Sequence, residues 1–227
     1  MPYRTVPFIK EEIYHIYNRS VAKVPLFPHH TDYQHFLEIL HYYRYFNPPV
    51  RFSIFNRLPI EANKHVIEQL KTSPAIVDIY AYCLMPTHFH FLIKEIVEGG
   101  ISIYLRRSQN SYAKYFNTKY KRSGALFQSM FKSTRIEHEE QFIHTARYIH
   151  LNPFTGGIIR NINEILTYPW SSMHAYCTHR VCADTTFINV NPILTQFTSP
   201  EELQKFTLDQ ADYQRSLIST NYNFEEL

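Results

Sequence analysis

The stretch Tyr82-Cys83-Leu84-Met85-Pro86-Thr87-His88-Phe89-His90-Phe91-Leu92-Ile93-Lys94 places two histidines two positions apart in an otherwise apolar run. On a β-strand, residues at this spacing leave the same face, so His88 and His90 should point together while Phe89 packs behind them. Two aligned imidazoles are suited to holding a metal ion. Buried, hydrogen-bonded histidines would produce the same pattern, and the pair alone does not choose between the two interpretations.

The histidine pair belongs to one of four expected strands. Alternating or β-branched patterns bounded by turn residues predict these strands at residues 13–19, 76–84, 87–94 and 126–136. The second and third are joined tightly around Met85-Pro86, which predicts a β-hairpin with the histidines on its second arm.

Helices are expected between these strands. A capping box at Thr31 and Gln34 begins one helix, which stops before Asn47, and residues 101–121 form a longer one. The order strand, helix, strand, strand, helix, strand predicts an α+β fold of the ferredoxin-like (RRM-like) type, an antiparallel sheet with both helices on one face. A short strand at 50–55 and a helix at 61–71 are interpreted as an insertion covering about residues 47–75.

Size and composition fit one elaborated domain, since 227 residues that are 44% hydrophobic can bury a proper core. No apolar run approaches the roughly 20 residues of a membrane span, and the first residues lack a signal core, which predicts a cytoplasmic protein. Three cysteines without a C-x-x-C pair predict reduced thiols. Four potential zinc ligands lie within nine residues, a spacing too tight to surround one tetrahedral ion: His174, Cys177, His179 and Cys182.

Charge is distributed unevenly, although the net charge is only +3. Between Gly99 and Ile136 there is no Asp or Glu, and eight basic residues occur: Arg106, Arg107, Lys114, Lys119, Lys121, Arg122, Lys132 and Arg135. Seven aromatic residues are interleaved with them, and exposed rings of this kind stack on unpaired bases. Core rings beside a solvated helix face are the plain alternative. We favour nucleic acid binding because a solvated face normally mixes both signs of charge.

A further helix is expected from Glu139 to Asn152, where Pro153 should end it. Tyr148 and Asn152 lie four positions apart and therefore project from the same side of this helix. An ordinary amphipathic helix, with Asn152 as its C-terminal cap, would have the same pattern. The tail beyond Trp170 is expected to form short helices packed on the core.

Several motifs in order resemble the single-tyrosine HUH transposases, most closely the REP-associated tyrosine transposases. They extend from about Tyr14 to Tyr176 and are, in order, residues 14–19 (Tyr-His-Ile-Tyr-Asn-Arg), residues 83–90 with the histidine pair, residues 112–117 followed by 123–128, residues 148–153 (Tyr-Ile-His-Leu-Asn-Pro) and residues 168–172 (Tyr-Pro-Trp-Ser-Ser). The resemblance implies a catalytic domain at residues 1–176, with an added tyrosine-bearing helix, and a C-terminal extension at 177–227 packed on it.

The resemblance also implies roles for particular residues. Tyr148 would be the nucleophile, and His88, His90 and Asn152 would hold a divalent ion, Mg²⁺ or Mn²⁺ in that family, although imidazole ligands alone would equally suit Zn²⁺ or Ni²⁺. The substrate would be single-stranded or hairpin DNA, cleaved through a 5′-phosphotyrosine intermediate and rejoined at the same site. The expected DNA contacts are Arg19, Arg106, Arg107, Lys114, Lys121, Arg122 and Lys132. Both a homodimer and a monomer stay open.

Three alternatives remain beside this reading. Tyr115, within a second family motif, is a competing nucleophile. A non-catalytic module of the same fold could bind DNA without cutting it, but it would have no use for a phenol beside two histidines. A metal-dependent hydrolase would need a carboxylate base near the histidines, and Glu95 lies at an odd offset on the opposite strand face. Thr87 and Met130 depart from the family pattern, and Met130 puts one phosphate contact in doubt.

Overall fold

The computed structural model describes residues 6–177 and 187–219, and its centre is a four-stranded antiparallel sheet. The strands are β1 (Ile13–Arg19), β2 (Val77–Met85), β3 (His88–Glu95) and β4 (Lys132–Arg135), arranged in the order β2-β3-β1-β4. The hairpin β2–β3 pairs from Met85 opposite His88 down to Val77 opposite Glu95. The element order and pairing confirm the expected ferredoxin-like fold.

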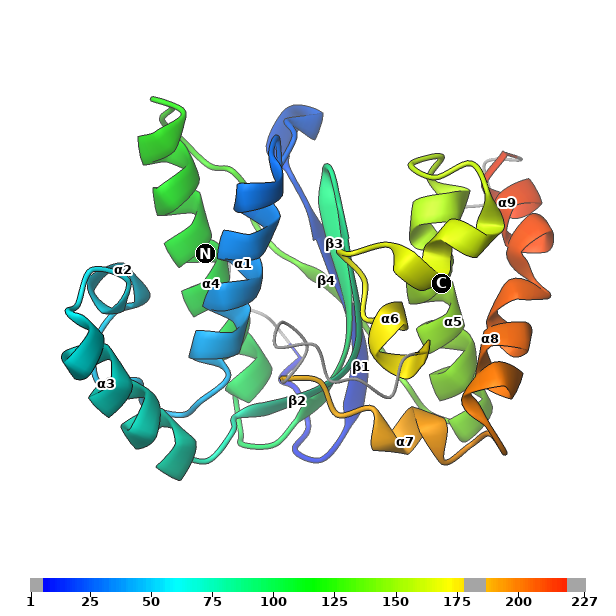
Figure 1. Cartoon of the computed structure of the whole chain (residues 1–227), viewed down its shortest axis with the longest axis horizontal. Coiled ribbons are helices and arrows are strands. Elements are labelled where there is room, and N and C mark those ends of the chain that lie inside the picture. Colours follow the sequence, from blue (N-terminus) through cyan, green and yellow to red (C-terminus); the bar gives the residue numbers. More distant parts are fainter. Residues whose placement is uncertain (1–5, 178–186, 220–227) are drawn as a thin grey trace.

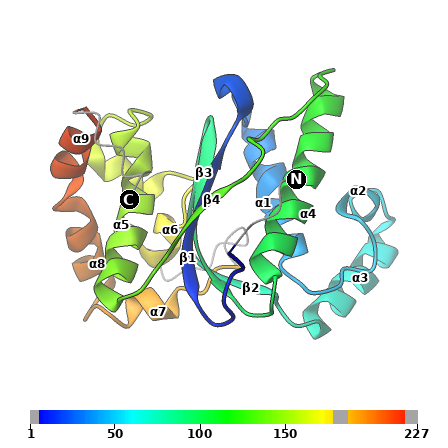
Figure 2. The same ribbon diagram turned by 180° about the vertical axis from the view of Figure 1, so that it is seen from behind.

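Helices cover both faces of the sheet (Figures 1 and 2). Helices α1 (His30–Tyr43) and α4 (Gly100–Lys119) lie on one face, and α5 (Glu139–Thr155) lies on the other. Alternation along β3 explains the division, because Phe89 packs against Phe36 of α1 while His90 faces α5 and contacts Tyr148. The sheet is therefore buried between two helical layers, and the histidine face is the one that α5 covers.

The start of α4 is held by the end of β3. The Glu95 carboxylate accepts hydrogen bonds from the N–H groups of Gly99 (2.6 Å) and Ile101 (2.9 Å), which have no partners within the helix. Burial raises the pKa of Glu95, and these donors oppose that shift. Glu95 is thus a structural cap on the α4 side of the sheet, which agrees with its expected position on the strand face opposite the histidines.

The insertion consists of two helices and the loops around them, so the strand expected at residues 50–55 was wrong. Residues Phe52–Phe55 form the short helix α2, and Ile60–Thr72 form α3. Phe52 is 2% exposed, its ring lies 5.4 Å from that of Tyr42, and its N–H donates to the Tyr43 hydroxyl. The β-forming side chains of this segment pack against the end of α1, and residues 50–55 pair with no strand in the described part of the chain.

Two element boundaries also differ from expectation. Helix α1 begins at His30, because the Asp32 carboxylate accepts the His29 N–H at 2.9 Å, and Thr31 is not the cap. Strand β4 occupies only Lys132–Arg135, while Phe127 makes one isolated bridge to Ser20. The rest of the expected strand runs as an irregular segment beside the end of β1.

Helix α5 continues through Pro153 to Thr155, so the expected stop at Asn152 was wrong. Proline cannot donate to the carbonyl of residue 149, four positions earlier. The Asn152 side-chain amide lies 3.5 Å from that carbonyl and 2.9 Å from the carbonyl of Tyr148. This side-chain contact compensates for the missing backbone bond in the last turn.

In the C-terminal part, α8 (Pro200–Leu208) and α9 (Ala211–Ser219) pack on α5. This part also contains the helices α6 (Met173–Cys177) and α7 (Asn191–Leu194), and the 3-10 helix η2 (Ile162–Thr167) precedes them. A second 3-10 helix, η1 (Val21–Lys23), follows β1 near the start of the chain. The Arg147 guanidinium of α5 lies 4.3 Å from the Phe206 ring centre. Of the four residues weighed as zinc ligands, His179 and Cys182 lie outside the described residues. None of the described helices is both long and apolar enough to cross a bilayer.

Candidate active site

The centre of the candidate site is His90, which β3 directs toward α5. His90 has no exposed surface, and its ring stacks on Tyr17 of β1 with centres 5.6 Å apart. The ring of His88 lies 5.2 Å from that of His90, nearly perpendicular to it. The two-residue spacing therefore brings both imidazoles to the same face, as the sequence predicted.

A third imidazole, that of His15, joins this pair. His15 Nε2 lies 3.0 Å from His90 Nδ1, a hydrogen-bonding distance. The antiparallel register places Tyr17 opposite His90 and His15 opposite Leu92, so His15 is the diagonal neighbour of His90 on the α5 side. Sequence reasoning missed His15 as a site residue. Its alternation with Tyr17 and Arg19 was visible, but the register between β1 and β3 was not.

Helix α5 supplies the phenol. The Tyr148 ring lies 5.8 Å from the His90 ring and 5.7 Å from the His15 ring, in both cases edge to face. The backbone carbonyl of Tyr148 accepts hydrogen bonds from Asn152 (2.9 Å) and from Gln214 of α9 (3.3 Å). Sheet and helix thus meet within one chain, with Tyr148 directly against two imidazoles.

Asn152 lies one turn further along α5 and is 6% exposed. Its side-chain nitrogen donates to the carbonyls of Tyr148 and Ile149. The side-chain oxygen is then the atom of this amide that could coordinate a cation. The expected role of Asn152 as a ligand therefore concerns this oxygen alone.

The imidazoles of the site are uncharged at neutral pH. Burial lowers the pKa of His15 to about 4, and burial together with the nearby Arg19 charge lowers the pKa of His88 to about 4. The pKa of His90 is lowered well below its ordinary value, first by burial and then by the neighbouring His88, His15 and Arg19. Neutral imidazoles keep a lone pair for a metal ion.

The chemistry of the His88 and His90 imidazoles and of the Asn152 side-chain oxygen suits a divalent cation that has further ligands outside the protein. His90 Nε2 is a buried atom without a hydrogen-bond partner, which is the state expected of a nitrogen that bonds to something else. Among the described residues, no three His, Cys, Asp or Glu side chains come together to hold an ion. Two imidazoles and an amide oxygen leave coordination positions for phosphate oxygens and water.

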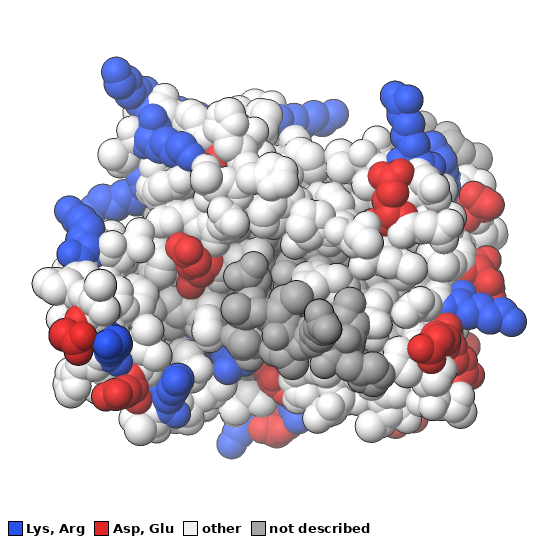
Figure 3. All heavy atoms as spheres, in the orientation of Figure 1, with Lys and Arg blue, Asp and Glu red and all other residues white. Residues whose placement is uncertain are grey.

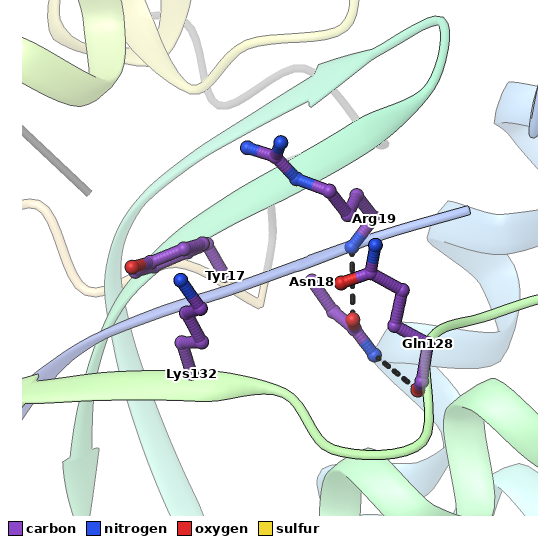
Figure 4. Close-up of a pocket in the computed structure, with 5 residues that line it drawn as sticks. All are labelled: Tyr17, Asn18, Arg19, Gln128 and Lys132. Carbon is purple, nitrogen blue, oxygen red and sulfur yellow. Dashed lines mark hydrogen bonds between the residues drawn. The ribbon is translucent and has the colours of Figure 1, made fainter. Parts of the chain in front are cut away.

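A polar pocket adjoins the histidines at the end of β1 (Figure 4). It has a volume of about 220 Å³ and is lined by Tyr17, Asn18, Arg19, Gln128 and Lys132. The Lys132 ammonium lies 5.8 Å from the Tyr17 ring centre, on the strand next to it. Of the seven expected DNA contacts, Arg19 and Lys132 are the two that line this pocket.

The other five basic residues are carried by α4 and the turn after it, in the layer across the sheet from α5: Arg106, Arg107, Lys114, Lys121 and Arg122. Arg107 donates to the carbonyl of Phe46 and Arg122 to that of Ala125, so both also stabilise loops. Figure 3 shows basic side chains gathered over the C-terminal end of α4, and both signs of charge over α2 and α3. The basic helix is separate from the histidine face.

Tyr115 lies on α4, on the opposite side of the sheet from the histidines. Its hydroxyl donates to the Asp32 carboxylate (3.1 Å) and contacts the Lys119 ammonium (3.0 Å). It therefore takes part in a polar cluster between α1 and α4. The two tyrosines considered as nucleophiles thus lie on opposite faces, and only Tyr148 contacts His90.

Comparison with known families agrees with these features. The family model described as "Transposase IS200 like" matches residues 36–152, more than half of the chain, including His88, His90, Tyr148 and Asn152. The chain belongs to the IS200-like transposase family. This membership confirms the resemblance found in the sequence motifs, while His15 and Arg19 lie before the matched segment of this transposase.

A solved structure shows the same fold. It is described as a REP-associated tyrosine transposase bound to a REP hairpin, and it aligns with a TM-score of 0.52 and 16% sequence identity over 84% of this transposase and 93% of the other chain. At this identity the likeness concerns the fold alone. No curated protein sequence matches the chain.

Proposed function

We propose that this IS200-like transposase cleaves and rejoins single-stranded DNA, with Tyr148 as the nucleophile. The observation that carries the proposal is the edge-to-face contact of the Tyr148 ring with the neutral imidazoles of His90 and His15. A phenol, two same-face histidines and an amide one helical turn beyond the phenol are the groups that a tyrosine nucleophile assisted by a cation requires. All of them come from one chain, which supports a site that is complete in a monomer.

In the proposed reaction the Tyr148 oxygen attacks the scissile phosphorus. A phosphorus–phenol oxygen bond forms, the bond to the 3′ oxygen breaks, and the phenol proton is lost while the leaving oxygen gains a proton to become a 3′-hydroxyl. The 5′-phosphotyrosine bond keeps the energy of the diester, so another 3′-hydroxyl can attack it and release Tyr148. A phenol ordinarily ionises near pH 10, so attack at neutral pH needs charge stabilisation.

His88, His90 and the side-chain oxygen of Asn152 would hold the divalent cation, Mg²⁺ or Mn²⁺. When bound, such an ion supplies positive charge that polarises a phosphate oxygen. The packing of His90 between Tyr17 and His15 orients its ring toward α5. That orientation is set by the protein before any substrate binds, which is what a precise ligand position requires.

Hairpin DNA is the proposed substrate. Support comes from the solved relative, whose description states that it is bound to a REP hairpin. Arg19 and Lys132 would contact the strand near the cut. Arg106, Arg107, Lys114, Lys121 and Arg122 would contact backbone further away, since α4 is across the sheet from α5.

Incubation with a DNA hairpin that carries a single-stranded extension, in the presence of Mg²⁺ or Mn²⁺, tests the proposal. We expect wild type to form a covalent adduct that survives a denaturing gel, and Tyr148→Phe to form none, because only the attacking oxygen is removed. Tyr115→Phe is the matched control and should form the adduct at the wild-type level, because its hydroxyl contacts Asp32 and Lys119. Adduct formation by Tyr148→Phe would refute the assignment. Hairpin binding without any adduct would instead support a non-catalytic DNA-binding module.

His15 provides a second prediction, measured without DNA. If His90 Nε2 binds the cation, the ring proton resides on Nδ1 and is donated to His15 Nε2. Loss of such an outer-shell partner typically costs about 10–100-fold in metal affinity, so His15→Leu should weaken Mn²⁺ binding by that factor. His15→Gln, which keeps an acceptor, should lose much less. Equal Mn²⁺ affinity of wild type and His15→Leu, measured by calorimetry or electron paramagnetic resonance, would contradict this role.

A further inference from the structure

We propose that the polar pocket at the end of β1 binds a backbone phosphate of the DNA strand, adjacent to the phosphate that Tyr148 attacks. The inference rests on the proposed function and adds a binding subsite to it. In this inference Arg19 and Lys132 contact the same phosphate group and do not only attract DNA through their charge.

The composition of the pocket suits an anion. Two of its five lining residues are cationic and none is acidic. The exposed Gln128 amide adds hydrogen-bonding groups without charge. Its volume of about 220 Å³ is below the roughly 300–1,000 Å³ of pockets that enclose whole drug-sized ligands, and so suits one unit of a longer strand.

The walls of the pocket are held in place by the protein itself. The Asn18 side chain donates to Gln109 of α4 at 2.8 Å and to the carbonyl of Gln128 at 3.4 Å, and it accepts the N–H of Arg19 at 2.9 Å. The N–H of Gln128 donates to the carbonyl of Arg19 at 2.9 Å. Figure 4 shows Asn18 turned toward Gln128 while Arg19 and Lys132 extend from β1 and β4. A preformed site loses little entropy on binding.

The position of the pocket connects it to the nucleophile. Tyr17 forms part of its lining and also stacks on His90, which contacts Tyr148. Arg19 lies opposite His88 in the β1–β3 pair. A strand whose scissile phosphate lies at the histidines therefore has its neighbouring phosphate within reach of Arg19 and Lys132.

A phosphate fits the pocket better than a base does. Tyr17, the aromatic residue in the lining, is 6% exposed, and the Lys132 ammonium lies over its ring. A ring buried in this way offers no open face for base stacking. Lys132 is itself exposed on the edge strand, so its replacement should leave the fold intact.

The test measures binding, in a Tyr148→Phe background that cannot cleave. The probe is a hairpin oligonucleotide with a single-stranded extension, titrated at several salt concentrations. Losing one phosphate contact to a single strand should reduce the salt slope by about 0.7, and we expect Lys132→Gln to do so and to bind about fivefold more weakly at low salt. Lys71→Gln, which removes an exposed charge on α3, is the control and should change neither value. An unchanged slope in Lys132→Gln would overturn the inference.

Uncharged methylphosphonate linkages, placed one at a time along the extension, locate the phosphate. At one linkage the substitution should weaken wild-type binding most and should weaken Lys132→Gln and Arg19→Gln less, since one of two contacts to that phosphate is already lost. In the double variant, which has lost both contacts, it should add nothing. That linkage should lie within two nucleotides of the cut mapped with wild type. The inference would be overturned if every neutral linkage weakened wild type and the variants by the same factor. It would also be overturned if the linkage whose effect depends on Lys132 and Arg19 were distant from the cut.

The two proposals fail separately. Adduct formation by wild type without any coupling to Lys132 would remove the phosphate subsite and leave the proposed function intact. Coupling at one linkage without any adduct would support the subsite as a binding site and would remove the nucleophile assignment.

Discussion

Replacing His90 with asparagine is expected to reduce covalent adduct formation by about a hundredfold to a thousandfold. The asparagine amide can occupy the place of Nδ1 and still donate to His15, but it has no atom at the position of Nε2, the buried nitrogen without a hydrogen-bond partner. The substitution therefore removes the proposed metal ligand and retains the neighbouring contact. Losing one group that stabilises transition-state charge typically costs about 10²–10³ in rate. Single-turnover adduct formation with Mg²⁺ or Mn²⁺ measures the effect.

A buried histidine outside the site provides the matched control. His150 lies on α5, two residues from Tyr148, but its Nε2 is 2.8 Å from the Ser172 hydroxyl on a different side of the helix. His150→Gln retains a group for that contact and should form the adduct at close to the wild-type rate. Hairpin affinity of His90→Asn in the absence of metal should also be unchanged. Similar rate losses in both variants would mean that the His90 effect is a general packing defect.

Replacing Gly100 with alanine is expected to destabilise the protein by about 3 kcal/mol or more. An added Cβ would lie 2.3 Å from the Ile76 carbonyl oxygen and 3.3 Å from a Val97 methyl group. The carbonyl cannot move away easily, because it accepts the N–H groups of Ile96 and Val97. Relief of the clash would separate the start of α4 from the start of β2.

Gly99 is the matched control for this effect. It has a left-handed φ of 73° but nothing within 4 Å of an added Cβ. Gly99→Ala should therefore cost only the conformational term, about 1 kcal/mol. Urea denaturation followed by circular dichroism gives the free energy of unfolding of both variants. Equal losses would contradict the proposed close approach of Gly100 to Ile76.

Local patterns were enough to predict the architecture. The alternation of His88, Phe89 and His90 indicated which face of β3 each side chain occupies, since strand geometry has a period of two. The four-residue spacing of Tyr148 and Asn152 indicated one side of a helix in the same way. Errors occurred where a local preference competed with tertiary packing, as at Phe52, which packs against Tyr42, and at Pro153, where the Asn152 amide reaches the carbonyl that lacks its donor.

The sequence by itself therefore determined the order of the core strands and helices, the same-face histidine pair and the family, because periodicity and motif order are properties of neighbouring residues. The tertiary structure decided which of these residues meet. The register between β1 and β3 brought His15 to His90 and Arg19 beside His88, and the sheet separated α4 with Tyr115 from α5 with Tyr148. Contacts between strands and helices that are distant in sequence depend on the pairing register and on which face of the sheet each helix covers. Neither of these produces a periodic pattern in the sequence.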